Sequence, residues 1–196
     1  MPKISEERRA ERVEQILAGA RRCFAEHGYE KATVSRLENA IGLSRGAIFN
    51  YFGSKEDLFI ELAVEDSARI SALWVHDGLR AVIEEVVETD PAWFGVYLEL
   101  IRRVRTDREF RERIEKRQEA VVPVNRERAE EAQRTGEFRG DVEAREIGLF
   151  VNLVLNGLAL QRASGEDPPP VDLVVRLLED AIGGPARSST PSRTRP

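Results

Sequence analysis

The chain has little of what disulfide-linked, metal-binding and membrane proteins depend on. One of its 196 residues is cysteine and two are histidine, so an intramolecular disulfide is excluded and a Cys/His zinc site is not indicated. Cys23 lies on an apolar helix face, where we favour an inert core thiol over a redox sensor. No apolar run reaches the roughly 20 residues that a transmembrane helix needs, and the first residues lack the apolar stretch of a signal peptide. These absences predict a cytoplasmic protein without a membrane partner.

The signatures of an enzyme are missing as well. The chain has no nucleophile motif, no Gly-rich phosphate loop and no metal-ligand spacing, and neither His27 nor His76 has an evident catalytic partner. We therefore expect a protein that is not an enzyme and that requires no cofactor.

The charge is unevenly distributed along the chain. The formal net charge is −5, yet residues 1–53 carry nine Lys/Arg and seven Asp/Glu, a net of +2, and the remainder carries a net of −7. The net charge argues against a nucleic-acid partner for the chain as a whole, but its distribution matters more than the sum, and the N-terminal quarter is the basic part. Because this quarter is only mildly basic, its affinity for DNA has to come from well-placed contacts.

The hydrophobic pattern predicts an all-α fold. Apolar residues recur at three- and four-residue spacings along most of the chain, and no segment shows the alternation typical of a strand. Pro123 lies inside the longest expected helix and predicts a kink or break there. The tail, 184–196, is expected to be disordered because it is rich in Gly, Pro, Ser and Arg. The expected helices cover residues 7–27, 34–41, 45–52, 54–75, 79–88, 91–104, 108–134, 144–163 and 171–182.

Three capping residues indicate a helix-turn-helix in residues 33–52. Thr33, Ser44 and Ser54 can each accept hydrogen bonds from the first backbone N–H groups of a helix, and Gly42 can end the first of the short helices. Two short helices joined by a tight turn are the layout in which the second helix enters the major groove of DNA. The alternatives are a structural helical hairpin with a merely solvated polar face and a helical interaction module that does not bind DNA.

The polar side of this segment carries the chemistry of base recognition. Arg45 can donate two hydrogen bonds to guanine, and Asn50 can pair with adenine. Gly46 has no side chain, so the start of its helix can approach the bases closely. Hydroxyl and ammonium groups suited to phosphate follow the same side: Thr33, Ser44, Tyr51 and Lys55. We expect the opposite, buried side to consist of Val34, Leu37, Ile41, Leu43, Ile48 and Phe52.

The sequence resembles the tetracycline-repressor (TetR) family over about residues 12–60. The resemblance rests on ILAGARRCF at 16–24, GYEKATV at 28–34 and GAIFNYFGSKEDLF at 46–59. It implies a homodimer on a palindromic operator in double-stranded DNA. It also implies a small-molecule effector that changes the spacing of the two recognition helices.

The resemblance also implies a division of the chain and a set of contacts. A three-helix DNA-binding domain covers residues 1–53, and a six-helix ligand-binding and dimerisation domain covers residues 54–183. Phe49 departs from the tyrosine of many members, so a phosphate contact through a hydroxyl is lost. Arg45 and Gly46 match the base-reading start of the recognition helix, and the positions that commonly touch DNA are matched by Thr33, Ser44, Phe49, Asn50, Tyr51 and Lys55.

The residue pattern of the second domain, 54–183, predicts a dimer interface and a pocket. Residues 144–163 are apolar around most of the helix, so we expect them to form a four-helix bundle with residues 171–182 and a second copy. The alternative is a purely intrachain core. Trp93 and Tyr97 are candidates for a pocket wall, although such residues are also common in cores. Asn156, four residues after Asn152, needs a partner for its amide, either across the dimer or in the pocket.

A narrower resemblance is to the actinobacterial aconitase-repressor subgroup. It rests on LEL at 98–100, RTD at 105–107, FR at 110–111, DV at 141–142 and residues 153–158. It implies control of a citric-acid-cycle gene and citrate with a divalent cation, such as magnesium, as effector. Arg128 and Glu179 match the effector positions, with Arg128 suited to carboxylate and Glu179 to the metal ion. The alternatives are two surface charges, and a regulator of an efflux or catabolic gene that senses an apolar or aromatic ligand.

Overall fold

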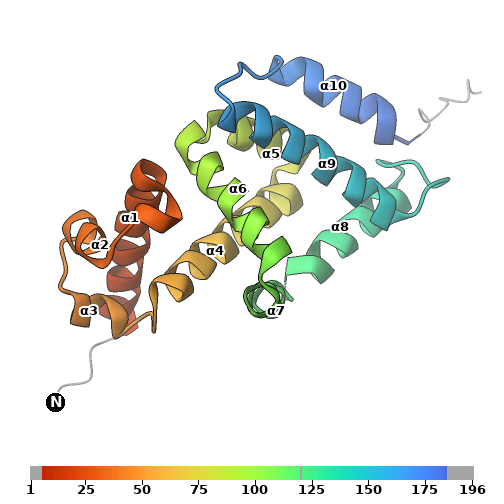
Figure 1. Cartoon of the computed structure of the whole chain (residues 1–196). Coiled ribbons are helices and arrows are strands. Elements are labelled where there is room, and N and C mark those ends of the chain that lie inside the picture. Colours follow the sequence, from red (N-terminus) through yellow and green to blue (C-terminus); the bar gives the residue numbers. More distant parts are fainter. Residues whose placement is uncertain (1–5, 120, 185–196) are drawn as a thin grey trace, which may run out of the picture.

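The computed structural model describes residues 6–119 and 121–184, and these residues form ten helices (Figure 1). This part of the chain contains no strand, and a single backbone bridge pairs Phe138 with Gly183. None of its helices is long and apolar enough to cross a membrane. The all-α prediction is therefore confirmed. The helices are α1 Glu6–Lys31, α2 Val34–Ile41, α3 Arg45–Phe49, α4 Lys55–His76, α5 Gly78–Glu88, α6 Pro91–Thr106, α7 Arg108–Gln118, α8 Val121–Thr135, α9 Ala144–Ala163 and α10 Val171–Ile182.

Helices α1, α2 and α3 form the N-terminal unit, at the left of Figure 1. Leu37 of α2 and Ile48 of α3 are fully buried against Ile16 and Phe24 of α1. Gly19 lets α1 and α2 approach closely, because a Cβ at this position would lie 2.7 Å from the Cα of Ile41. The apolar side of the helix-turn-helix is thus bound to α1, and its polar side is left for solvent.

The ends of these short helices follow the capping pattern of the sequence, with two differences. The first helix was expected to end at residue 27, and Gly28 interrupts it there with φ 70° and ψ 167°, but one further turn extends α1 to Lys31. Helix α3 stops at Phe49, three residues earlier than expected. The backbone tightens there, since the N–H groups of Tyr51 and Phe52 both donate to the carbonyl of Ile48, and Phe52 turns into the core.

Helix α4 connects the N-terminal unit to the rest of the molecule. Its first turns contribute Leu58 and Phe59 to the same core as α1, whereas Trp74 near its end belongs to a separate core with Phe138. In Figure 1, α4 runs from beside α3 to the far end, where α5 and α8 pack against it and Trp74 shares its core with Val151 of α9. A movement of α4 would therefore be felt at both ends of the molecule.

The expected helix over residues 108–134 is divided into α7 and α8. Helix α7 ends at Gln118 and α8 begins at Val121, so Pro123 lies in a first helical turn instead of inside a helix. A proline costs no helical hydrogen bond there, because the first N–H groups of a helix have no partner within it. The second domain consequently has seven helices among the described residues where six were expected.

The predicted disordered tail is described only at its first residue. The N–H of Gly184 donates to the carbonyl of Glu137 at 2.9 Å, beside the bridge between Phe138 and Gly183. Residues 185–196 lie outside the described residues.

Candidate DNA-binding face and effector cavity

The start of α3 is exposed and unobstructed. Ser44 caps the helix through a 3.4 Å hydrogen bond from the N–H of Ala47, and the backbone N–H of Arg45 donates to Glu38 at 2.6 Å. Both Arg45 and Gly46 are exposed, and no atom lies within 4 Å of the place that a Cβ on Gly46 would take. A DNA base edge can therefore come close to this helix start.

The other predicted DNA contacts surround this start. Thr33 and Asn50 are exposed, at the N-cap of α2 and the C-cap of α3. Tyr51 is half-buried, and the guanidinium of Arg9 lies 5.4 Å from its ring centroid. Phe49 is also half-buried and packs against the core of α1 and α4. The predicted buried side is confirmed for Leu37, Ile41, Ile48 and Phe52, while Val34 and Leu43 are half-buried.

Lys55 lies at the junction of the two domains, where its ammonium group is already bound within the protein. Its ammonium donates to the carbonyl of Tyr29 at 2.8 Å and lies 4.2 Å from the Tyr29 ring centroid. Partial burial lowers the pKa of this ammonium. An ammonium has three donors, and the carbonyl of Tyr29 accepts from one of them.

Helix α6 contacts the end of α1 at the same junction. Glu99 accepts the backbone N–H of Tyr29 at 2.6 Å and fills the space beside Gly28. Arg103 lies 4.9 Å from the Tyr29 ring centroid and pairs with Glu56 at 2.6 Å. The sequence analysis did not single out Glu99 or Arg103 for this role, because no local pattern shows that α6 reaches α1. The structure makes Tyr29 the meeting point of α1, α4 and α6.

A cavity of about 550 Å³ lies among α4, α6, α7 and α9, and three predicted effector residues line it together. The Tyr97 hydroxyl donates to the side-chain carbonyl of Asn156 at 2.8 Å, and the Asn156 amide donates to Asn152 at 2.6 Å. Burial raises the pKa of Tyr97, so the hydroxyl keeps its proton. Trp93 forms another part of the wall. The amide of Asn156 thus has its partners within the same chain, whereas Asn152 is exposed on α9.

The cavity wall touches the DNA-binding unit directly. Asp66, which lines the cavity, accepts a 2.6 Å hydrogen bond from the Trp93 indole N–H and a 2.7 Å contact from Arg21 of α1. The Arg21 guanidinium also lies 4.4 Å from the Trp93 ring centroid. A change at Trp93 therefore acts on α1 without an intervening residue.

Arg128 and Glu179 lie apart from this cavity. The Arg128 guanidinium donates to both carboxylate oxygens of Glu137, at 2.8 and 3.0 Å, and lies 5.7 Å from the Trp74 ring centroid. Glu179 is exposed on α10, and its backbone carbonyl accepts from Gly183 at 2.7 Å. Gly183 therefore lies one helical turn after Glu179, and the next residue, Gly184, donates its backbone N–H to the backbone carbonyl of Glu137. Within residues 6–119 and 121–184, no three His, Cys, Asp or Glu side chains are grouped in a way that would hold a metal ion.

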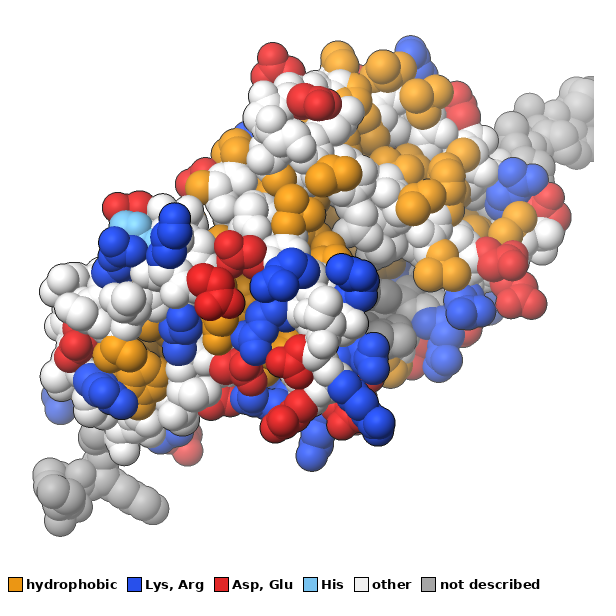
Figure 2. Space-filling model, viewed as in Figure 1, with side chains coloured by type: hydrophobic (Ala, Val, Ile, Leu, Met, Phe, Trp, Pro, Cys, Tyr) orange, Lys and Arg blue, Asp and Glu red, His pale blue; other side chains and the backbone are white. Residues whose placement is uncertain are grey.

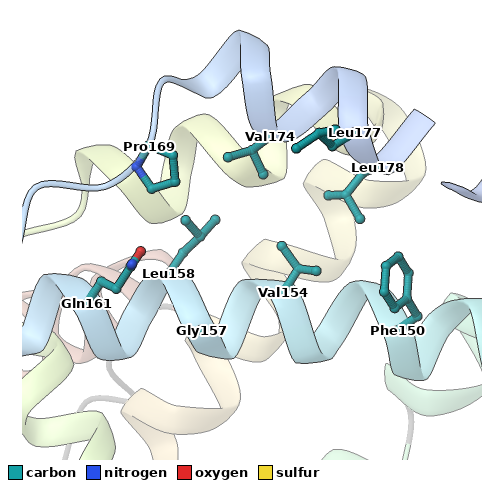
Figure 3. A pocket seen from close by; sticks show the side chains of 9 residues that line it. All are labelled: Phe150, Val154, Gly157, Leu158, Gln161, Pro169, Val174, Leu177 and Leu178. Carbon is teal, nitrogen blue, oxygen red and sulfur yellow. The ribbon is translucent and has the colours of Figure 1, made fainter. Parts of the chain in front are cut away.

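Helices α9 and α10 present an apolar face to solvent. Leu153 is 70 % exposed, Leu177 58 % and Leu149 57 %, and hydrophobic side chains gather on this side of the molecule in Figure 2. A groove of about 360 Å³ runs between the two helices, where Phe150 and Val154 face Leu177 and Leu178 (Figure 3). Exposed apolar patches of this kind mark protein interfaces.

Two family profiles match the chain. The profile "Bacterial regulatory proteins, tetR family" matches residues 16–62 and so contains the helix-turn-helix. The profile "BetI-type transcriptional repressor, C-terminal" matches residues 75–184, more than half of the chain.

Solved structures share the architecture. GusR of Salmonella enterica superposes with a TM-score of 0.70 at 20% identity, covering 92% of this chain and 98% of that one. The fatty acid degradation regulator FadR of Bacillus halodurans gives a TM-score of 0.68 at 21% identity, covering 95% and 99%. At these identities the likeness concerns the fold.

Curated relatives are much more similar in sequence. The chain is 41% identical over 184 residues to the HTH-type transcriptional repressor Rv1474c of Mycobacterium tuberculosis, covering 93% of this chain and 98% of the relative. It is 39% identical over 194 residues to the HTH-type transcriptional repressor AcnR of Corynebacterium diphtheriae, covering 98% and 100%. These relatives are regulators and not enzymes, and they confirm both resemblances found in the sequence. The chain therefore belongs to the TetR family of transcriptional repressors and is closely related to AcnR and Rv1474c.

Proposed function

We propose that the protein represses transcription by binding a palindromic operator as a homodimer. The exposed start of α3 carries this proposal, because Arg45 and Gly46 are both exposed there and the space beside Gly46 is open. In this proposal Arg45 and Asn50 read bases, and Thr33, Ser44, Tyr51 and Lys55 position the helix on the phosphates. Phe49 supplies packing beneath this surface and no hydroxyl.

The homodimer uses the apolar face of α9 and α10. Exposed leucines on both helices cost free energy in water, and a two-fold axis lets the same patch cover itself. Two α9–α10 pairs then form a four-helix bundle, and the pairing holds two recognition helices at the spacing of two half-sites. We assign residues 1–53 to DNA binding, 54–183 to dimerisation and effector binding, and 184–196 to a disordered tail.

The effector we propose is citrate with a divalent cation, and the regulated gene is that of aconitase. The repressors named AcnR support this choice, being 38–41% identical over most of the chain. One nitrogen of the Arg128 guanidinium already donates to both oxygens of the Glu137 carboxylate, and a carboxylate of citrate would be held by the same guanidinium. Citrate would replace Glu137, and Glu179 would share the cation with oxygens of the ligand. The repressor itself needs no cofactor.

A second candidate is a TetR-type regulator of an efflux or catabolic gene that senses an apolar or aromatic ligand. The cavity lined by Trp93, Tyr97 and Asn156 favours it, since its volume suits a small organic molecule. Its contact with Arg21 provides a route from ligand to α1.

Two measurements test the proposal. A mobility shift with the DNA upstream of the protein's own gene should give a salt-sensitive specific complex; a folded protein that shifts no such fragment contradicts operator binding.

Calorimetry tests the effector. It should show heat with citrate plus magnesium and little with citrate alone, and Arg128→Gln should abolish the heat of binding. Arg126→Gln, an exposed position two residues away, serves as the control. Equal heats from both variants, or no heat from the unaltered protein, would remove citrate and leave repression standing.

A further inference from the structure

The first turn of α4 carries two carboxylates beside the residue proposed to contact phosphate. Glu56 and Asp57 follow Lys55 directly in the chain. Acidic side chains in a first turn stabilise a helix, because its N-terminus carries a partial positive charge. The same carboxylates would repel the phosphates of an approaching DNA. The two charges that favour the helix at this position therefore oppose the binding proposed for it.

Two arginines from the second domain neutralise this turn. The Arg113 guanidinium of α7 donates to both Glu56 and Asp57, and Arg103 of α6 donates to Glu56 at 2.6 Å. Two negative charges are thus paired with two positive ones, and the ammonium of Lys55 is left as the net charge of this helix start.

A comparable ion pair joins α7 to α4 farther from the DNA-binding unit. Arg117 pairs with Glu61, which lies five residues after Glu56 and therefore about 7 Å farther along the helix. In Figure 1, α7 and α3 both lie on the lower side of the molecule, and in Figure 2 Lys/Arg and Asp/Glu side chains are interleaved over the region of α7. The chain thus has two ion pairs of the same chemistry at different distances from Lys55.

The ion pairs of Arg113 act on charge more than on folding. The side chains of Arg113 and Asp57 are 37 % and 38 % exposed, and ion pairs exposed to this degree add little stability. Their effect on an approaching phosphate reaches farther, because the Debye length at 0.1 M salt is about 10 Å. Glu56 is adjacent to Lys55, so its carboxylate lies within about that distance of a phosphate held by Lys55. Without Arg113, this carboxylate would oppose DNA binding.

We propose that Arg113 supports DNA binding from the second domain by neutralising Glu56 and Asp57 beside Lys55. The proposal rests on the proposed function only in placing Lys55 on a phosphate. Arg113 itself does not touch the DNA and acts through the two carboxylates. Helix α7 thereby sets the charge of the DNA-binding surface, although it lies outside the helix-turn-helix.

Substitutions of opposite charge test the proposal in the full-length protein. Its affinity for a DNA duplex of random sequence is measured, since repulsion between charges does not depend on base sequence. Relative to the unaltered protein, Arg113→Gln should weaken binding roughly three- to tenfold at about 50 mM salt and less than about twofold at about 300 mM, where charges are screened more strongly. Glu56→Gln should leave binding unchanged or strengthen it by up to about threefold, because the amide still accepts hydrogen bonds but has no charge.

Two further variants separate the charge from a structural role. The double variant Arg113→Gln/Glu56→Gln keeps Asp57 and Arg103 as one charge of each sign, so it should bind within about twofold of the unaltered protein. Arg117→Gln breaks the more distant ion pair between the same two helices and is the matched control, which should also bind within about twofold.

Thermal melts check that each variant is folded, and if Arg113→Gln is not, the sign of the Glu56→Gln effect decides. Weaker binding by Glu56→Gln, equal losses for Arg113→Gln and Arg117→Gln, or a loss with Arg113→Gln that is the same at both salt concentrations would each overturn the proposal. Binding of random DNA without a specific complex on the upstream fragment would count against the operator alone and leave this role of Arg113 standing.

Discussion

Tyr29 is a single residue that connects the DNA-binding unit to two helices of the second domain. It follows the break at Gly28, gives its N–H to Glu99, its carbonyl to Lys55 and one face of its ring to Arg103. Burial raises the pKa of its hydroxyl. Since the three partners come from α4 and α6, a shift of either helix against α1 changes the contacts of this residue. Lys55 therefore has two tasks, one at this junction and one proposed on DNA.

Arg45 and Lys55 should differ in how their loss affects DNA binding. Arg45→Ala should weaken operator binding roughly 10- to 100-fold, because one two-point base contact is lost, and should change binding to random DNA little. Lys55→Ala should weaken both alike and reduce the log–log salt slope by about one. Titrations of operator and random duplexes at several salt concentrations give both quantities. Identical behaviour of the two variants would refute the separation into base and phosphate contacts.

Cys23 should behave as an inert core thiol. It is 2 % exposed, and burial raises its pKa, so both the access and the thiolate fraction needed for reaction are small. We expect a thiol reagent at neutral pH to modify it roughly a hundredfold more slowly in the folded protein than in denaturant, since reaction requires local opening. Rates from absorbance traces settle the comparison. Fast modification of the folded chain would support the redox alternative.

At the scale of elements, two glycines of the DNA-binding unit have opposite reasons to be glycine. Gly19 lies where α1 touches α2, with Ile41 and the carbonyl of Ala40 within 3 Å of a hypothetical Cβ. Gly46 lies on α3 with nothing near it. One residue sets the distance between two helices, and the other leaves room for a partner outside the chain.

Alanine at these two positions should therefore separate stability from DNA binding. Gly19→Ala should destabilise the protein by about 1–3 kcal/mol, because the methyl group overpacks the α1–α2 contact. Gly46→Ala should be neutral or stabilising by up to about 1 kcal/mol, yet should weaken operator binding roughly tenfold by holding the helix away from the bases. Urea unfolding and a mobility shift measure the two effects. A Gly46→Ala variant that binds the operator normally would exclude close approach at this position.

At the scale of the whole molecule, the apolar surface is concentrated on α9 and α10. Leu155 lines the cavity, so a substitution there would disturb the interior. Leu153, 70 % exposed, is the cleaner probe of the proposed interface.

Leu153→Arg should therefore produce monomers without unfolding the chain. In the proposed interface, a charge at this exposed apolar position would be buried against the apolar side chains of the second copy without a partner. We expect sedimentation at the monomer mass and an operator affinity lower by roughly a hundredfold, because the two half-sites are then bound independently. Val124→Arg, at an exposed apolar position on α8, should remain dimeric. A dimeric Leu153→Arg variant would place the interface elsewhere.

The sequence by itself determined the local features of this protein. Caps at Thr33, Ser44 and Ser54 and the left-handed Gly42 depend on neighbouring residues only, and the structure confirms all four. The all-α class and the buried side of the helix-turn-helix follow from periodicity, which is also local. Family membership was accessible in the same way, because its motifs are contiguous.

Only the tertiary structure decided the contacts between distant segments. Pro123 marked a break, but the end of α7 at Gln118 and the start of α8 at Val121 belong to the packing of two separate helices. The hydrogen bond between Glu99 and Tyr29 joins residues 70 positions apart, and the one between Trp93 and Asp66 joins residues 27 positions apart. Hydrophobic periodicity does not predict such pairs. Arg128 and Glu179 could be selected by resemblance, yet the pairing of Arg128 with Glu137 and its separation from the cavity depend on where α8 and α10 pack. The sequence determines which chemical groups the chain has, whereas the packing of the helices determines which group each side chain contacts.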